Sequence, residues 1–304
     1  GLSIIPVSLA VSVLFFVIFV LWEKSREKAH KNVLLDLDLF KVASFRNGSI
    51  AATIISMGEF GLLFAIPLWL QNVEGLTPVS SGMVLLWLAG GAFLASGVGG
   101  AMSGKLPAVR AVQIGVLFEL VGVAGIALVA TTGGGWWPVA PFLLLYGIGV
   151  GLATAQLTGV IMVDVPMTKI GQASGSQSTV RQIGSALGIA VLGTVLFTAT
   201  QASAEARLQD TAYVQQLPAT AQDEFIAGLT DAVVDSAGAA LPGIGEFAKA
   251  NFGASDEAAT EIQTAANDGF TDGVKATGWA AAAFLALGLI STFSMGSKRR
   301  RNKE

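Results

Sequence analysis

Seven apolar runs divide this chain of 304 residues, and each is long enough to cross a lipid bilayer as a helix. The hydrocarbon core of a bilayer is about 30 Å thick, and roughly 20 helical residues span it. The runs occupy residues 2–22, 48–70, 82–102, 109–130, 138–163, 179–199 and 277–295. They are continuously apolar and do not alternate with polar residues, so they predict helices and not barrel strands. We therefore expect an all-α polytopic membrane protein.

The composition argues against several classes of function. Only 13% of the residues are charged, whereas a soluble domain carries about 25%. The chain has no cysteine and a single histidine, so we expect neither disulfides nor a metal centre. It lacks a Ser/His/Asp set, and the glycine repeat Gly147, Gly149 and Gly151 lies inside an apolar run with no strand before it, unlike a phosphate-binding loop. The sequence therefore predicts no enzyme, no cofactor and no nucleic-acid partner.

The distribution of basic residues predicts how the chain is oriented. All but three of the 18 lysines and arginines lie in alternate connections and in the C-terminal tail. The three exceptions are Arg207, Lys249 and Lys275. Lys and Arg concentrate on the cytoplasmic side of membrane proteins. We therefore expect the tail after Met295 to be cytoplasmic and the connection 200–276 to lie on the opposite side.

The connection 200–276 is longer and more acidic than the others. It holds 12 of the 21 acidic residues. Its apolar residues recur at helical spacing, which predicts two or three short amphipathic helices outside the membrane. One set is Phe225, Ile226, Leu229, Val233 and Val234, and another is Ala258, Ile262, Ala265 and Ala266. The alternative is a flexible loop without a function of its own.

Several short stretches resemble one transporter family. They are residues 66–73 (IPLWLQNV), 75–78 (GLTP), 171–175 (GQASG) and 181–188 (RQIGSALG). In this order they are similar to the C-terminal half of the 14-span drug:proton antiporters of the major facilitator superfamily. The resemblance implies a proton-coupled efflux transporter for multiple drugs or other small molecules in a bacterial cytoplasmic membrane. Its partners would be protons, the lipid bilayer and a small amphipathic or cationic substrate.

The resemblance also implies a division of the chain. Residues 1–22 would be an extra central helix, residues 23–47 a cytoplasmic connector, and residues 48–304 the C-terminal six-helix bundle with its long loop 200–276. The N-terminal bundle would be missing, and the chain indeed opens at Gly1 inside an apolar run, without a methionine. We therefore expect a piece of a longer transporter. The alternative is a truncated membrane fragment or scaffold that does not transport.

Two acidic residues inside the apolar runs are candidates for proton coupling or substrate binding. Glu59 lies near the middle of the second run and Glu119 near the middle of the fourth. An ionised group in hydrocarbon is costly, so such residues usually face a cavity or a partner. A carboxyl group there can take up a proton on one side and release it on the other, or bind a cationic compound. The alternative is a structural acid that is always protonated.

Asp164 and Arg181 flank the connection between the fifth and sixth runs and are candidates for a cytoplasmic gate. Pro166 is expected to end the fifth helix, and Gly171 and Gly175 to make a flexible re-entry into the membrane. Arg181 would then pair with Asp164 or with a helix C-terminus in one state of the transporter. The alternative for Arg181 is an interfacial anchor whose charge reaches the lipid phosphates.

Small and amide residues complete the set of candidates. Gly147 and Gly151, like Gly184 and Gly188, are spaced four apart, which lets membrane helices approach closely. We expect these four glycines to mediate helix packing. Polar groups that could line a substrate path are Gln71, Gln156 and Gln182.

Overall fold

The structure, a computed structural model, describes residues 4–28, 33–34, 36–101 and 106–295. Seven of its helices are long and apolar enough to cross a membrane, which confirms the prediction of an all-α polytopic fold. They are α1 (Ile4–Lys28), α2 (Ala43–Asn72), α3 (Pro78–Ala101), α4 (Ala108–Val129), α5 (Ala140–Met162), α6 (Ile170–Gln209) and α10 (Asp256–Thr292). Three shorter helices, α7 (Ala212–Gln216), α8 (Ala219–Asp235) and α9 (Ile244–Phe252), lie between α6 and α10. Four 3₁₀ turns complete the described elements: η1 (Leu37–Lys41), η2 (Met167–Lys169), η3 (Leu241–Gly243) and η4 (Phe293–Met295).

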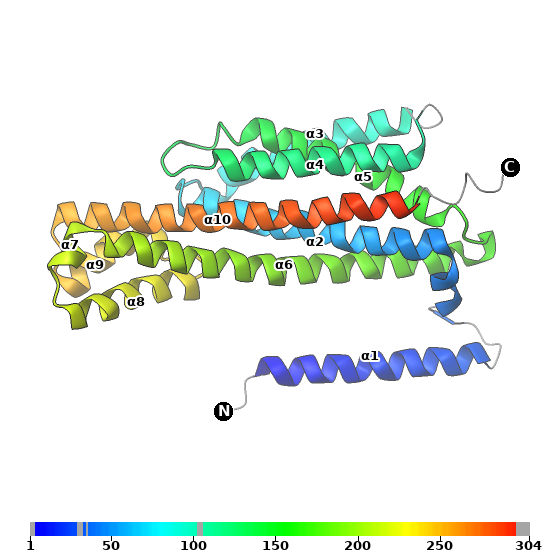
Figure 1. The fold of residues 1–304 in the computed structure, drawn as a ribbon, viewed down its shortest axis with the longest axis horizontal. Helices are drawn as coiled ribbons and strands as arrows, with labels where there is room; N and C mark the ends of the chain where they lie inside the picture. Colours follow the sequence, from blue (N-terminus) through cyan, green and yellow to red (C-terminus); the bar gives the residue numbers. More distant parts are fainter. Residues whose placement is uncertain (1–3, 29–32, 35, 102–105, 296–304) are drawn as a thin grey trace.

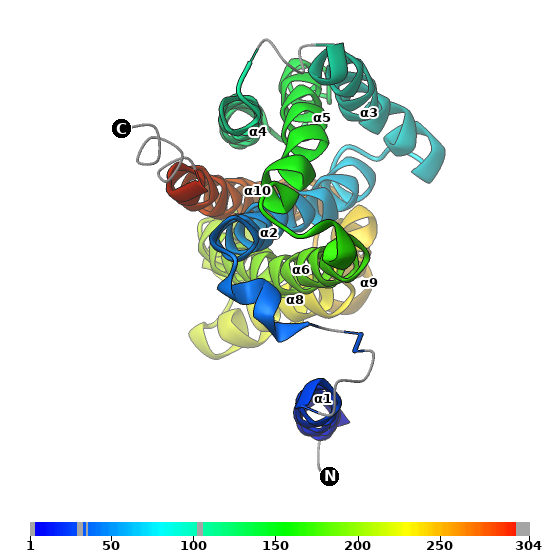
Figure 2. The ribbon, with the colours of Figure 1, turned by 90° about the vertical axis from the view of Figure 1, so that its right-hand side faces the viewer.

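The helices α2 to α6 and α10 form two packed groups (Figures 1 and 2). In one group α2, α6 and α10 pack against one another, and in the other α3 and α4 both pack on α5. The helix α10 also contacts α4, and α2 contacts α5, so the two groups share one interior. The helix α1 lies apart from this bundle (Figure 2). Its apolar side chains are mostly exposed.

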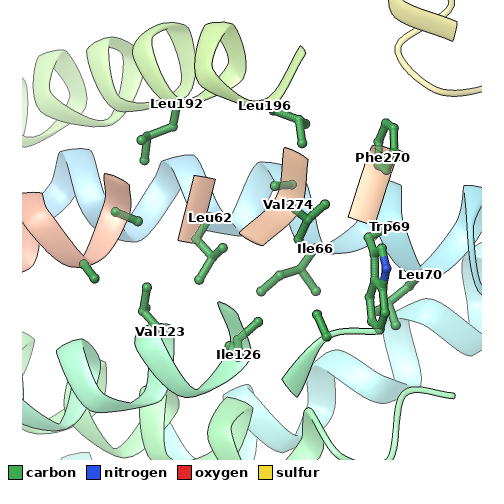
Figure 3. Packing of buried hydrophobic residues seen from close by; sticks show 14 of the residues in the cluster. Leu62, Ile66, Trp69, Leu70, Val123, Ile126, Leu192, Leu196, Phe270 and Val274 are labelled. Atoms are coloured by element: carbon green, nitrogen blue, oxygen red, sulfur yellow. The ribbon is translucent and has the colours of Figure 1, made fainter. Parts of the chain in front are cut away.

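The interior of the bundle is filled by aliphatic and aromatic side chains (Figure 3). Its centre is contributed by α2, α4, α6 and α10, through Leu62, Ile66, Trp69, Val123, Ile126, Leu192, Leu196, Phe270 and Val274, each less than 3% exposed. Lipid tails are as apolar as these side chains, so their contribution comes from close packing more than from removal of water.

Glycines set the closest helix contacts. A Cβ atom at Gly184 would lie 2.6 Å from the carbonyl oxygen of Thr53, and one at Gly188 would collide with the main chain of Met57. On the other side of the bundle, Gly147 faces the main chain of Leu88 and Gly151 that of Ala92. All four glycines expected to mediate packing therefore lie where a neighbouring backbone leaves no room for a side chain.

Two helices are much longer than the apolar runs that predicted them. The helix α6 has 40 residues, or about 60 Å at the usual helical rise, which is about twice the hydrocarbon thickness. It begins at Ile170, so Gly171 and Gly175 are helical and not the flexible re-entry that we expected. The helix α10 begins at Asp256, about 20 residues before the run 277–295. Both extensions point away from the rest of the bundle (Figure 1).

The helices α7, α8 and α9 with η3, residues 212–252, form a cap on the extensions of α6 and α10 (Figure 1). Phe225 and Leu229 of α8 are buried, and the hydroxyl of Tyr213 donates to the carbonyl of Phe252 at 2.7 Å. The side chain of Gln263 joins the cap to α10, because it accepts from the Gly245 amide and donates to the Leu241 carbonyl. The connection 200–276 is thus a packed helical unit. The first predicted amphipathic set, at Phe225, lies in the short helix α8, whereas the second, at Ala258, belongs to the long helix α10 and not to a short helix of its own. The basic tail 296–304, on which the orientation partly rests, lies outside the described residues.

Candidate functional site

Glu59 lies on a tightly packed turn in the middle of α2. On one side of it, a Cβ atom at Gly58 would lie 2.9 Å from the Leu285 side chain of α10, and on the other Gly61 packs against Leu192 of α6. Glu59 itself is 4% exposed. The absence of side chains at the two glycines lets α10 and α6 approach the turn of α2 that carries Glu59.

Arg181 of α6 is the charged partner of Glu59. Its Nη2 lies 3.8 Å from Oε2 of Glu59, and the arginine side chain is 28% exposed. The sequence predicted instead that Arg181 would pair with Asp164 or with a helix C-terminus at the connection between α5 and α6. Because α6 begins at Ile170, Arg181 lies roughly 16 Å along this helix, where it reaches Glu59. Asp164 is exposed outside α5, and within the described residues no ion pair joins it to Arg181.

Tyr146 of α5 contacts the same turn of α2. It is fully buried, and its hydroxyl donates to the main-chain carbonyl of Glu59 at 2.9 Å. Gly122 of α4 packs against the backbone of Tyr146. Sequence reasoning missed this residue. Its only signal was a phenol within an apolar run, and nothing in the run indicated which helix the hydroxyl would meet.

Glu119 of α4 is the most enclosed acid of the bundle's described part. It is 0% exposed, and neither carboxyl oxygen has a hydrogen-bond partner there. A Cβ atom at Gly149 of α5 would lie 2.7 Å from its Cγ. An electrostatic interaction links it to Glu59 and to Arg181. Glu59, Glu119, Tyr146 and Arg181 thus form one group from four helices, in which Arg181 alone is partly exposed, and we call it the Glu59 cluster.

The Glu59 cluster contains two carboxyl groups and one guanidinium group. In an apolar interior a charge needs a counter-ion, because desolvation disfavours an isolated ion strongly. Arg181 can neutralise one carboxylate, and it contacts Glu59. Uptake of a proton by Glu59 would cancel the negative charge that holds Arg181, so the cluster can couple protonation to the contact between α2 and α6.

The three glutamines proposed to line a path are not brought together. Gln71 lies at the end of α2, and Gln182 is exposed on α6. Gln156 donates to the Gly99 carbonyl at 3.0 Å, where it joins α5 to the far end of α3. A different amide, that of Gln177, is buried on α6 and donates to the Thr158 hydroxyl of α5 at 3.2 Å.

The connection between α5 and α6 contacts a segment that the sequence analysis did not indicate. Lys169 forms an ion pair with Asp36, and the side chain of Gln172 donates to the Val33 carbonyl at 2.7 Å. Both partners belong to the segment between α1 and α2. Within the described residues, these two polar contacts join the start of α6 to the segment between α1 and α2.

A hollow of about 570 Å³ lies between the extensions of α6 and α10. Its charged lining residues are Arg207, Asp210, Glu257, Glu261 and Asp268. No member of the Glu59 cluster lines it. The acidic surface is partly neutralised within the chain, since Arg207 pairs with Asp272 at 2.7 Å and with Asp268 at 3.4 Å.

The chain is similar in sequence to known membrane transport and resistance proteins. The profile of the family described as the Major Facilitator Superfamily matches residues 3–189, which include all four residues of the Glu59 cluster. A tetracycline resistance determinant of Streptomyces rimosus is 30% identical over 200 residues, 64% of this chain and 55% of that protein. The multidrug resistance protein Stp of Mycobacterium tuberculosis is 31% identical over 183 residues, 60% of this chain and 34% of that protein.

A third relative extends along most of the chain. The probable actinorhodin transporter of Streptomyces coelicolor is 25% identical over 304 residues, 94% of this chain and 52% of that protein. The chain therefore spans between 34% and 55% of the length of these three relatives.

Proposed function

Because the chain belongs to the major facilitator superfamily, we propose that it is the C-terminal half of a proton-coupled exporter in which Glu59 carries the coupling proton. Members of this superfamily are transporters and not enzymes. The seven candidate spans and the bacterial efflux relatives identify a multi-pass bacterial cell membrane protein. Its substrate is a small amphipathic or cationic compound.

The ion pair between Glu59 and Arg181 is the observation that carries this proposal. It joins α2 to α6 inside the apolar bundle, where a lone ion is costly. A proton arriving at Glu59 replaces Arg181 as the group that neutralises the carboxylate. A cationic substrate can do the same, so proton and cation compete for one group, as exchange requires. Glu119 is the second candidate for proton or cation binding.

The relatives' names support the direction of transport. They are called resistance determinants, multidrug resistance proteins and transporters, and one is named as a tetracenomycin C resistance and export protein. Substrate export by alternating access needs two helix bundles around a site near the membrane midplane. The bundle α2 to α10 supplies one of them, and the remaining length of the relatives leaves room for the other.

The test is substrate efflux from vesicles that contain the complete transporter, with an imposed pH gradient and with or without a protonophore. Wild type should export substrate only while the gradient persists. The Glu59→Gln variant, which keeps the shape but cannot ionise, should insert normally and lose gradient-driven export by at least about ten-fold. The variant cannot bind and release a proton at this position, and a ten-fold loss of rate corresponds to about 1.4 kcal/mol.

A matched control removes a carboxylate far from the Glu59 cluster. Glu246 lies in α9 and is 77% exposed, so Glu246→Gln should export at the wild-type rate. Protonophore-insensitive export by wild type would reject proton coupling. A stop codon just upstream of Gly1, with no reading frame for a second bundle, would instead support the alternative of a fragment or scaffold that does not transport.

A further inference from the structure

We infer that Tyr146 is a positioning residue for proton exchange, because its hydroxyl fixes the turn of α2 that presents Glu59 to Arg181. The inference rests on the proposed role of Glu59 and extends it to a residue that contacts neither proton nor substrate. The observation behind it is the hydrogen bond from the Tyr146 hydroxyl to the main-chain carbonyl of Glu59, which is 2.9 Å long and buried.

The geometry makes Tyr146 a support for the backbone and not for the carboxyl group. A main-chain carbonyl has two lone pairs, so it can accept the phenol in addition to its helical amide. Two glycines make the close packing contacts of this turn: Gly58 lies against the Leu285 side chain and the Ala281 carbonyl oxygen of α10, and Gly61 against the Leu192 side chain of α6. Packing contacts of this kind define the rotation of a helix less sharply than a directional hydrogen bond does.

The ion pair that depends on this position is easily disturbed. The distance of 3.8 Å between Arg181 and Glu59 exceeds that of a hydrogen bond, which is about 2.7–3.2 Å. The two charges therefore attract without a directional bond that would hold them in place. A small displacement of the α2 turn changes their separation directly. From α5, the hydrogen bond that the described residues show against such a displacement is that of the Tyr146 hydroxyl.

Three groups with charge or titratable protons face this turn from the helices packed around it. Arg181 comes from α6, Tyr146 from α5 and Glu119 from α4. The residues of α10 that meet it are apolar. Removal of the Tyr146 hydroxyl alters none of the charges, so any change in the pH dependence of Glu59 must act through its position.

The chain supplies a matched control, because its other tyrosine makes the same kind of bond elsewhere. Tyr213 donates its hydroxyl to the Phe252 carbonyl at 2.7 Å in the cap. Both Tyr146→Phe and Tyr213→Phe therefore lose one hydrogen bond from a phenol to a main-chain carbonyl. They differ in whether that carbonyl belongs to Glu59, and in burial, since the bond of Tyr146 is buried and that of Tyr213 is exposed.

The experiment measures proton-driven efflux by the complete transporter as a function of pH for the two variants. We expect Tyr146→Phe to lower the rate about two- to ten-fold, as loss of one such bond implies. We also expect the pH of half-maximal exchange to rise, because a weaker contact with Arg181 lets Glu59 keep its proton to a higher pH. Tyr213→Phe should leave both unchanged. An unshifted pH profile in Tyr146→Phe would overturn the inference.

A second measurement needs no transport, so it separates failure of this inference from failure of the proposed function. Thermal unfolding in detergent is followed against pH for wild type, Tyr146→Phe, Glu59→Gln and the double variant. The effect of Tyr146→Phe should vary with pH in the wild-type background and be constant in the Glu59→Gln background. A constant effect in both backgrounds assigns Tyr146 to packing alone. If Tyr146→Phe does not fold, 3-fluorotyrosine at position 146, a stronger donor of the same shape, should shift the pH dependence in the opposite direction, and no shift would contradict the inference.

Discussion

An ionisable side chain inside an apolar helix is stable with a partner, a cavity or a proton, and the residues of the Glu59 cluster differ in which of these they have. Glu59 has Arg181 at 3.8 Å. Glu119 has no hydrogen-bond partner within the described residues and no exposure. Glu119 therefore satisfies the requirement only as a neutral acid or while it binds a cation. The two carboxyl groups thus differ in their environment, because within the described residues Glu59 has an ion-pair partner and Glu119 has none.

At Glu119 we predict opposite effects of one substitution on stability and on transport. Glu119→Met should raise the free energy of unfolding by about 1 kcal/mol or more, since it removes two buried unsatisfied oxygens at similar volume. Proton-driven efflux should fall if the acid binds proton or substrate. Thermal unfolding and vesicle efflux would be measured together, with the exposed Glu224→Met as control. A drop in stability would instead identify Glu119 as a structural acid that the interior requires.

Sequence reasoning found the acids and missed their partners for a physical reason. A carboxyl group in an apolar run is visible because of its cost, which is a local property of α2 or α4. The pairing of Glu59 with Arg181, and the bond from Tyr146, depend on the register of α6 and α5 against α2. That register is set by glycine contacts such as Gly61 against Leu192 and Gly188 against Met57. The spacing of glycines predicts that helices approach, but not which helices.

At the scale of the helices, hydropathy predicted the existence of all seven spans but not the full length of two of them. The helix α6 extends beyond both ends of the run 179–199, and α10 begins at Asp256, well before the run 277–295. The extensions carry polar residues such as Gln201 and Asp268, so an apolar window cannot detect them. They continue as helices because they pack on each other: Gly269 and Gly273 of α10 lie against Ala204 and Thr200 of α6.

The contact between α2 and α6 should be sensitive to added volume. Gly188→Leu would force a side chain into the main chain of Met57, and overpacking of this kind costs about 1–3 kcal/mol. Gly159→Leu in α5 is the control, because no atom lies within 4 Å of a Cβ at that glycine. Membrane yield and thermal unfolding should fall for the first variant and not for the second. Equal behaviour of the two would show that α6 does not approach α2 at Gly188.

The end of α2 is tied to the connection between α4 and α5 by polar contacts. The hydroxyl of Thr271 donates to the Asn267 carbonyl at 2.9 Å and accepts from the indole of Trp69 at 3.1 Å. Its single proton is thereby used, so the hydroxyl of Thr132, 3.0 Å away, is the donor in that pair. One threonine of α10 thus joins α2 to the connection that follows α4.

Glu74, just after α2, also contacts the connection between α4 and α5. We expect it to make the stability of the fold depend on pH. Burial raises the pKa of Glu74, while hydrogen bonds from the amides of Gly133 and Gly135 oppose this shift. A carboxyl group whose pKa is raised by folding destabilises the fold above that pKa, and the penalty disappears as the pH falls towards the ordinary value of 4.5.

The Glu74→Gln variant cannot ionise, so it lacks this penalty at every pH. Its thermal midpoint should therefore exceed that of wild type at neutral pH, and this difference should become smaller at acidic pH. The measurement is thermal unfolding of both proteins in the same detergent across this range. A difference between them that does not vary with pH would show that Glu74 has the same proton affinity in the folded and unfolded chain.

Across the whole molecule, the described helices give one bundle with a cap at one end and the helix α1 beside it (Figure 1). The cap rests mainly on α6 and α10, which are adjacent helices of the group that also holds α2, and its Gly238 lies beside the Asn72 side chain at the end of α2. Arg181 lies on α6 as well. Any movement of α6 against α2 that follows protonation of Glu59 would therefore move the cap too, because α6 is one continuous helix from Ile170 to Gln209.

The distribution of basic residues predicts on which side of the membrane the cap lies. Single cysteines can be introduced to test this prediction, because the chain has no cysteine of its own. The connections with few basic residues are expected outside, and the cap contains one lysine, Lys249, and no arginine. A cysteine at the exposed Gln216 of α7 should react with an impermeant maleimide in intact cells. A cysteine at the exposed Thr168, in the connection before α6, should react only after permeabilisation. The reverse pattern would place the cap in the cytoplasm, and Glu59 would then receive its driving proton from the end of the bundle opposite to the cap.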